Sequence, residues 1–89
     1  MLQKRTSMPL LVTELRELSL ALMGGGTYEK HYARFVQKAA DELEAGIEDR
    51  SLGEYLEPFA EWLTKDCATE GHVVATACAC LSGQVPATA

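Results

Sequence analysis

The sequence has 89 residues, with eight lysines and arginines against thirteen aspartates and glutamates, and its formal net charge is -5. This length predicts a single small domain, and an apolar fraction of 47% with 24% charged residues is typical of a folded globular chain. The negative charge argues against direct binding to nucleic acid or to an anionic membrane surface, because both would bring like charges together.

The first predicted element is a helix over residues 8–23. Its apolar residues recur at intervals of three and four, which places them on one stripe of a helix: Met8, Leu11, Leu15, Leu18 and Leu22. Ser7 is the expected N-cap, and the run Gly24–Gly26 is expected to end the helix. Leu10 and Leu20 lie off the stripe, so the helix is expected either to be enclosed on two sides or to meet another chain.

A second helix is predicted over residues 28–45, capped by Thr27 and ended by Gly46. A third is expected to begin near residue 52, because Ser51 and Glu54 have the spacing of a capping box. Pro58 lies inside this third helix and predicts either a kink or a division into two helices.

The last predicted element covers residues 72–81, after a break at Thr69 or Gly71. Its side chains are almost all small or apolar, a composition typical of a buried helix. Residues 1–83 are therefore expected to form one all-α domain, a small bundle of three to four short helices, followed by a flexible tail at residues 84–89. The predicted core comprises Leu11, Leu15, Leu18, Leu22, Tyr32, Phe35, Val36, Ala39, Leu43, Phe59, Trp62, Leu63, Val74, Ala77 and Leu81.

The three cysteines, Cys67, Cys78 and Cys80, are an odd number without the spacing of a disulfide framework. This pattern predicts a reducing compartment, and we expect a cytoplasmic location. Charged residues interrupt the apolar run near the N-terminus, and no run approaches the roughly 20 apolar residues that a membrane span needs. We therefore expect a soluble chain without a targeting segment.

Three patterns resemble chemical sites, and each has a better structural explanation. Cys67, His72, Cys78 and Cys80 are of the residue types that bind zinc, but on one helix their side chains could not converge on one ion. The segment 24–27 resembles a phosphate-binding turn but lacks a lysine and a preceding strand, so a hinge between helices is expected.

His31, with Tyr28, Tyr32 and Arg34, could form a small polar aromatic pocket. We expect instead that the two tyrosines pack inward while His31 and Arg34 face solvent. No nucleophile has a partner base at a recognisable spacing, and we predict a protein that is not an enzyme and binds no metal or cofactor.

The strongest functional signal is an uneven charge distribution. Ten of the thirteen acidic residues lie between Asp41 and Glu70, where only Arg50 and Lys65 oppose them. A band of this kind either keeps a surface solvated or selects a partner with a basic surface. The residues expected to bind that partner are Glu44, Glu48, Glu54, Glu57, Glu61 and Tyr55.

We therefore predict a small acidic protein-interaction module, an adaptor or inhibitor that occupies the surface of a partner protein. A narrower alternative is that the carboxylates imitate nucleic-acid phosphates and block a nucleic-acid-binding complex, as a phage or mobile-element counter-defence protein would. A metal or thiol sensor is a third hypothesis. Surplus apolar surface on the first helix, or around Tyr55 and Trp62, is compatible with a homodimer.

Overall fold

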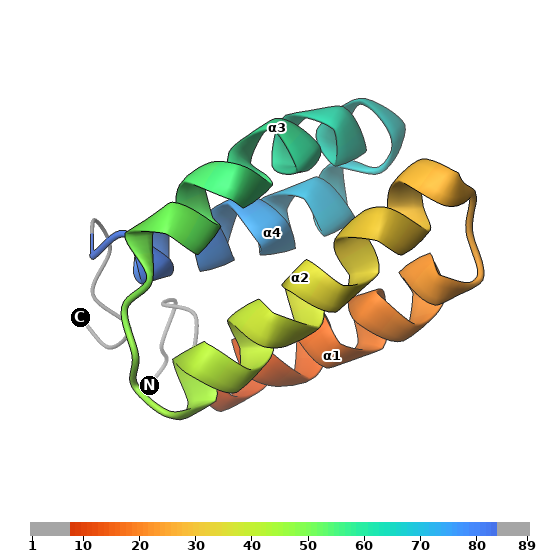
Figure 1. Cartoon of the computed structure of the whole chain (residues 1–89). Helices are drawn as coiled ribbons and strands as arrows, with labels where there is room; N and C mark the ends of the chain where they lie inside the picture. The colour runs from red at the N-terminus through yellow and green to blue at the C-terminus, as the bar shows by residue number, and fades with distance from the viewer. Residues whose placement is uncertain (1–7, 84–89) are drawn as a thin grey trace, which may run out of the picture.

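The computed structural model describes residues 8–83, and within that range the chain forms four helices and no strand (Figure 1). They are α1 (Met8–Met23), α2 (Thr27–Glu44), α3 (Arg50–Asp66) and α4 (Ala68–Leu81). The prediction of a small all-α bundle is thus confirmed. The predictions of a cap at Ser7 and of a tail at 84–89 lie outside the described residues.

The helices form two antiparallel hairpins that lie side by side (Figure 1). Helix α1 packs mainly on α2, and α3 packs mainly on α4. Smaller contacts join the hairpins through α2 with α3, α2 with α4, and α1 with α4. Because α2 and α3 are joined by the short connection 45–49, they form one edge of the bundle, where the two hairpins meet.

The helix starts differ in detail from the predictions. Helix α2 begins after Gly26 rather than after a Thr27 cap, and the Gly26 N–H donates to Oε1 of Glu29 at 2.6 Å. Helix α3 begins after Asp49, whose Oδ1 accepts from the Leu52 N–H at 3.0 Å. The predicted Ser51 cap is therefore wrong by two residues, since an aspartate just upstream reaches the same kind of orphan donor.

Pro58 lies inside a continuous α3, so it does not divide the helix. The predicted break at Thr69 or Gly71 is also wrong, because α3 ends and α4 starts at one residue, Cys67. This connection is tight because Gly71 lies against the backbone of Thr64. A Cβ atom at Gly71 would stand 2.6 Å from both Cα and N of Thr64, closer than real side chains come.

The core is a single cluster drawn from all four helices, with Phe59, Leu11, Leu15 and Leu56 among its largest fully buried side chains. The predicted core residues are buried with two exceptions: Phe35 is only partly buried, and Trp62 is 39% exposed. The prediction for Trp62 is therefore wrong. The helical stripe that contains Trp62 turns toward the α2–α3 edge rather than toward the centre, and the ring lies over that edge against Tyr28.

One buried polar group links α1 to α2. Ser19 is 2% exposed, and its hydroxyl donates to the carbonyl oxygen of Ala33 at 2.9 Å. This hydrogen bond satisfies the hydroxyl inside an otherwise apolar contact and ties the first hairpin together.

Candidate interaction surface

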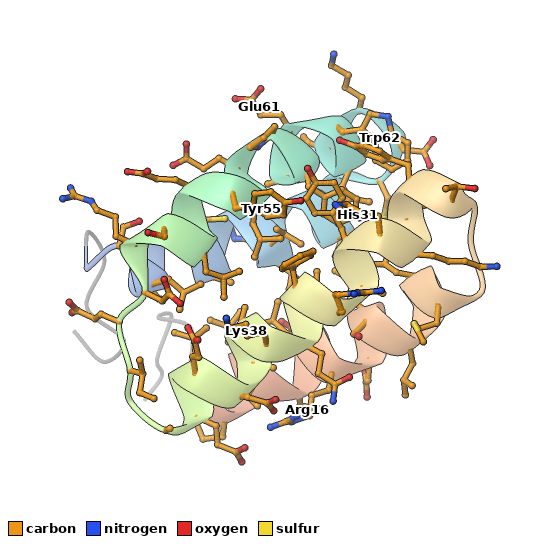
Figure 2. The ribbon with its side chains drawn as sticks, viewed as in Figure 1. Arg16, His31, Lys38, Tyr55, Glu61 and Trp62 are labelled. Carbon is orange, nitrogen blue, oxygen red and sulfur yellow. The ribbon has the colours of Figure 1, made fainter. Side chains whose placement is uncertain are left out.

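Aromatic side chains gather along the line where α2 meets α3. The six phenylalanine, tyrosine and tryptophan residues of the chain all lie there, three on each helix, together with one histidine. Figure 2 shows His31, Tyr55 and Trp62 pointing into this line from the two helices. We call it the aromatic seam: Tyr28, His31, Tyr32 and Phe35 of α2, and Tyr55, Phe59 and Trp62 of α3.

The floor of the seam is buried. The rings of Tyr32 and Phe59 stack with centroids 4.4 Å apart and an interplanar angle of 8°, and both residues belong to the core. Burial, with smaller contributions from the other two tyrosines, raises the pKa of the Tyr32 phenol, so this ring stays neutral. The floor therefore holds the two hairpins together at this edge.

The upper part of the seam is open. Tyr28 and Tyr55 are each 42% exposed, and Trp62 is 39% exposed. The centroids of Tyr28 and Trp62 are 4.7 Å apart, and Nε2 of His31 lies 2.7 Å from the Tyr55 hydroxyl oxygen. The expectation that Tyr28 packs inward is thus wrong, and exposed His31 belongs to the same cluster as the tyrosines. Sequence reasoning named the His31 group and the surface around Tyr55 and Trp62 separately, but it did not predict that they meet.

Opposite charges flank the seam on its two sides. The α3 side carries the acidic row, which we define as Glu54, Glu57 and Glu61, all exposed. The α2 side carries the basic row, which we define as Lys30, Arg34 and Lys38, also exposed. In Figure 2, Lys38 and Glu61 lie on opposite flanks of the labelled aromatic rings.

Several flank charges have no counterion among the described residues. Oε2 of Glu54 lies 3.8 Å from Nε of Arg50, and Nζ of Lys38 lies 4.0 Å from Oε2 of Glu42. Each is an i,i+4 pair on a helix surface, and such pairs contribute little to stability. The remaining flank charges form no ion pair with any of residues 8–83: Lys30, Arg34, Glu57 and Glu61. These charges are available to another molecule.

Two other predicted site residues lie elsewhere. Glu44 binds Nη2 of Arg16 at 2.5 Å, beside Asp41, which binds Nη1 at 2.8 Å. These carboxylates raise the pKa of Arg16 further and connect α2 to α1, on the side of α2 turned away from the seam. Glu48 is exposed in the connection between α2 and α3. Tyr55 therefore shares α3 with the acidic row, whereas Glu44 and Glu48 lie elsewhere.

The thiols are not arranged as a reactive or ligand-binding site. Cys78 is buried, and burial, with a smaller effect from the charge of Glu57, raises its pKa to about 12. Burial also raises the pKa of Cys80. Among residues 8–83, no three histidine, cysteine, aspartate or glutamate side chains are grouped so that they could hold a metal ion.

Two hollows lie away from the seam. One, of about 350 Å³, is formed by α1 with the end of α2 and includes Arg16 and Glu44. The other, of about 240 Å³, lies between α1 and α4 and is lined by Glu14, Glu17, Glu70 and neighbouring residues. Neither lining contains a nucleophile hydrogen-bonded to a base, so neither has the geometry of a nucleophilic active site.

Comparison with known proteins gives no match to a protein family, a curated protein or a solved structure. Within the described range 8–83, none of the helices has both the length and the apolar character that crossing a membrane requires.

Proposed function

We propose that the chain is a non-enzymatic protein-interaction module that binds a basic surface of a partner protein. As an adaptor or inhibitor of this kind, it acts by covering that surface. The observation that carries the proposal is the aromatic seam, where Tyr28, Tyr55 and Trp62 remain 39–42% exposed beside the acidic row.

Exposed aromatic residues on a rigid helix pair are well suited to binding. Tyrosine and tryptophan are enriched among the residues that dominate interface energies, where truncation costs about 2 kcal/mol or more. The buried stack of Tyr32 and Phe59 fixes the backbone beneath the exposed rings, so little conformational entropy is lost when a partner docks.

The acidic row supports a basic partner. The carboxylates of Glu57 and Glu61 have no counterion among residues 8–83, so arginine or lysine side chains of a partner can pair with them. Glu61 precedes the half-exposed Trp62, so a cation bound there can also contact that ring. A cation over an aromatic face contributes about 0.5–2 kcal/mol, depending on its desolvation. A cytoplasmic location, proposed from the three free cysteines, is compatible with such a partner.

The acidic row also supports the narrower alternative of nucleic-acid mimicry. Its three carboxylates recur at intervals of three and four on one face of α3, over about 10 Å of helix. In that version the partner's basic surface is its nucleic-acid-binding channel. The thiol and metal hypotheses gain no comparable support, because Cys78 is buried with a raised pKa.

The test is affinity capture from cells of the native host, with three forms of the chain as bait. Wild type is compared with the E54K/E57K/E61K variant and with an E14K/E17K/E70K control, which makes the same charge change at the α1–α4 hollow. We expect a protein that wild type and the control retain and the acidic-row variant loses. Circular dichroism verifies that all three keep the same helix content.

The captured protein is then purified and its affinity for the chain is measured against salt concentration. We expect binding to weaken as salt rises, because the contact is electrostatic. Competition by duplex nucleic acid would favour the mimicry version. Equal retention by all three baits, or binding insensitive to the acidic row, would contradict the proposal.

A further inference from the structure

The face of the bundle that carries the aromatic seam has basic residues along one side and acidic residues along the other. With about 100° of rotation per residue, Lys30 and Arg34 lie along the outer rim of α2, turned away from α3, and Lys38 lies nearer the rings. By the same rotation, Glu54 and Glu61 point outward from α3. A strip of half-exposed rings therefore separates a basic flank from an acidic flank.

The two flanks are in register. Helices α2 and α3 are antiparallel, and the ring contacts fix their alignment, since Tyr28 meets Trp62 and Phe35 meets Tyr55. In this alignment Lys30 stands at the level of Glu61, and Arg34 stands near the level of Glu54. Charges of the opposite sign also occur on each helix: Glu29, Asp41, Glu42 and Glu44 on α2, and Arg50 and Lys65 on α3. Of these, Glu42 lies near Lys38 and Arg50 lies near Glu54 of the same chain.

We infer that a second copy of the chain covers this face, in a twofold dimer whose axis runs parallel to α2 and α3. That rotation places α2 of one copy over α3 of the other without shifting either along its length. Lys30 then faces Glu61 of the second copy, Arg34 faces Glu54 of the second copy, and each contact occurs twice, as a closed dimer requires. The exposed rings of the two seams meet along the axis.

The alternative twofold axis, across the helices, is disfavoured by charge. It would place α2 over α2 and α3 over α3, so the basic rows would face each other and the acidic rows would do the same. Only the axis parallel to the helices brings together opposite charges and aromatic rings.

This inference does not rest on the proposed function, because it needs only the chain itself. If both hold, the dimer covers part of the acidic row, and a basic partner must compete with the second copy for it. Capture of a partner then depends on protein concentration, whereas dimer formation by the purified chain does not depend on any partner.

The test reverses the charges of one flank in each of two variants and then mixes the variants. Variant K30E/R34E and variant E54K/E61K each make the facing flanks alike in sign, so each is expected to be monomeric at concentrations where wild type is dimeric. Mixed together they restore opposite charges at both contacts, and a heterodimer is expected. Lys38 is left unchanged because it lies near the largely buried Glu42 of its own chain. Glu54 is included although it lies near Arg50, because both of those side chains are exposed and such a pair contributes little.

Sedimentation equilibrium measures the association of each form, and native mass spectrometry distinguishes heterodimer from homodimer. Variant E14K/E17K, which has the same net charge as E54K/E61K but is altered at the α1–α4 hollow, is the matched control. It should dimerise like wild type and should form no selective pair with K30E/R34E. Circular dichroism of every variant verifies folding.

The inference is overturned if wild type stays monomeric into the millimolar range, if either reversed variant dimerises as well as wild type, or if the mixture remains monomeric. Equal pairing of K30E/R34E with the E14K/E17K control would also overturn it, because overall charge rather than this face would then explain association.

Discussion

Replacing Gly71 with alanine tests the tight connection between α3 and α4. The added Cβ would lie 2.6 Å from Cα and N of Thr64, whereas contacts below 3.0 Å are essentially never seen for real Cβ atoms. The two helices must therefore separate by several tenths of an ångström where they join. Overpacking of this kind costs about 1–3 kcal/mol, and the better helix propensity of alanine returns at most about 1 kcal/mol in a first turn.

The expected net effect of Gly71→Ala is a loss of about 1–2 kcal/mol in the free energy of unfolding, or roughly 4–16 °C in Tm for a domain of this size. Urea denaturation followed by circular dichroism and by fluorescence of Trp62 measures it, at one fixed protein concentration because any self-association shifts apparent stability. Gly24→Ala is the control, since its Cβ would meet only Ala21 O at 3.6 Å.

A second variant distinguishes a backbone clash from a side-chain clash. Thr64→Ala removes the hydroxyl near Gly71 but leaves Cα and N in place, so the double variant should stay destabilised. Wild-type stability in Gly71→Ala, or full rescue by Thr64→Ala, would refute the reasoning.

Three further predictions concern groups at the helix ends and in the core. Ser19→Ala should lower the free energy of unfolding by about 1 kcal/mol in urea denaturation, because it removes a buried hydrogen bond; no change would mean that the bond adds nothing net. Asp49→Ala should cost about 1 kcal/mol at neutral pH by removing the α3 cap. The cap lowers the pKa of Asp49 below 3.8, chiefly through the Leu52 N–H, so its contribution should be present above pH 3.8 and fade as pH falls through the lowered value; a loss unaffected by acid would contradict this. The pKa of Glu42 is shifted in the opposite direction: its Oε1 is buried without a hydrogen-bond partner, and burial, with a smaller effect from Asp49, raises its pKa above 4.5. Burying the charged carboxylate should therefore lower the free energy of unfolding more and more as pH rises from 4.5 through the raised value. Glu42→Gln should stabilise the chain at pH 7 by roughly 1 kcal/mol in thermal melts. Equal stabilisation at pH 3 would refute this account.

The helices were predictable because their signals are local. The leucine stripe of α1 and the apolar face of α2 repeat every three or four residues, and glycine ends both helices near the predicted positions. Caps were less predictable, because Asp49 and Ser51 are both good capping residues two positions apart, and only the path of the incoming chain selects one.

The aromatic seam could not be derived in the same way. Its residues come from two segments about 30 positions apart, and their meeting depends on how the hairpins pack. Trp62 shows the difficulty, since its spacing from Phe59 and Leu63 matches a core stripe although its ring lies at the edge. One usable signal was present: the six large aromatic residues fall in two short runs, 28–35 and 55–62, on helices predicted to follow one another in the chain.

The most direct test of the central claim, that the α2–α3 face is the working surface, is site-specific photocrosslinking in cells. A photoreactive phenylalanine analogue is placed at Tyr55 in the seam or at Leu20 on the outer side of α1, where the side chain is 73% exposed. We expect crosslinked protein, either a partner or a second copy, from the Tyr55 position and little from Leu20. Crosslinking concentrated at Leu20, or none from Tyr55, would contradict the claim.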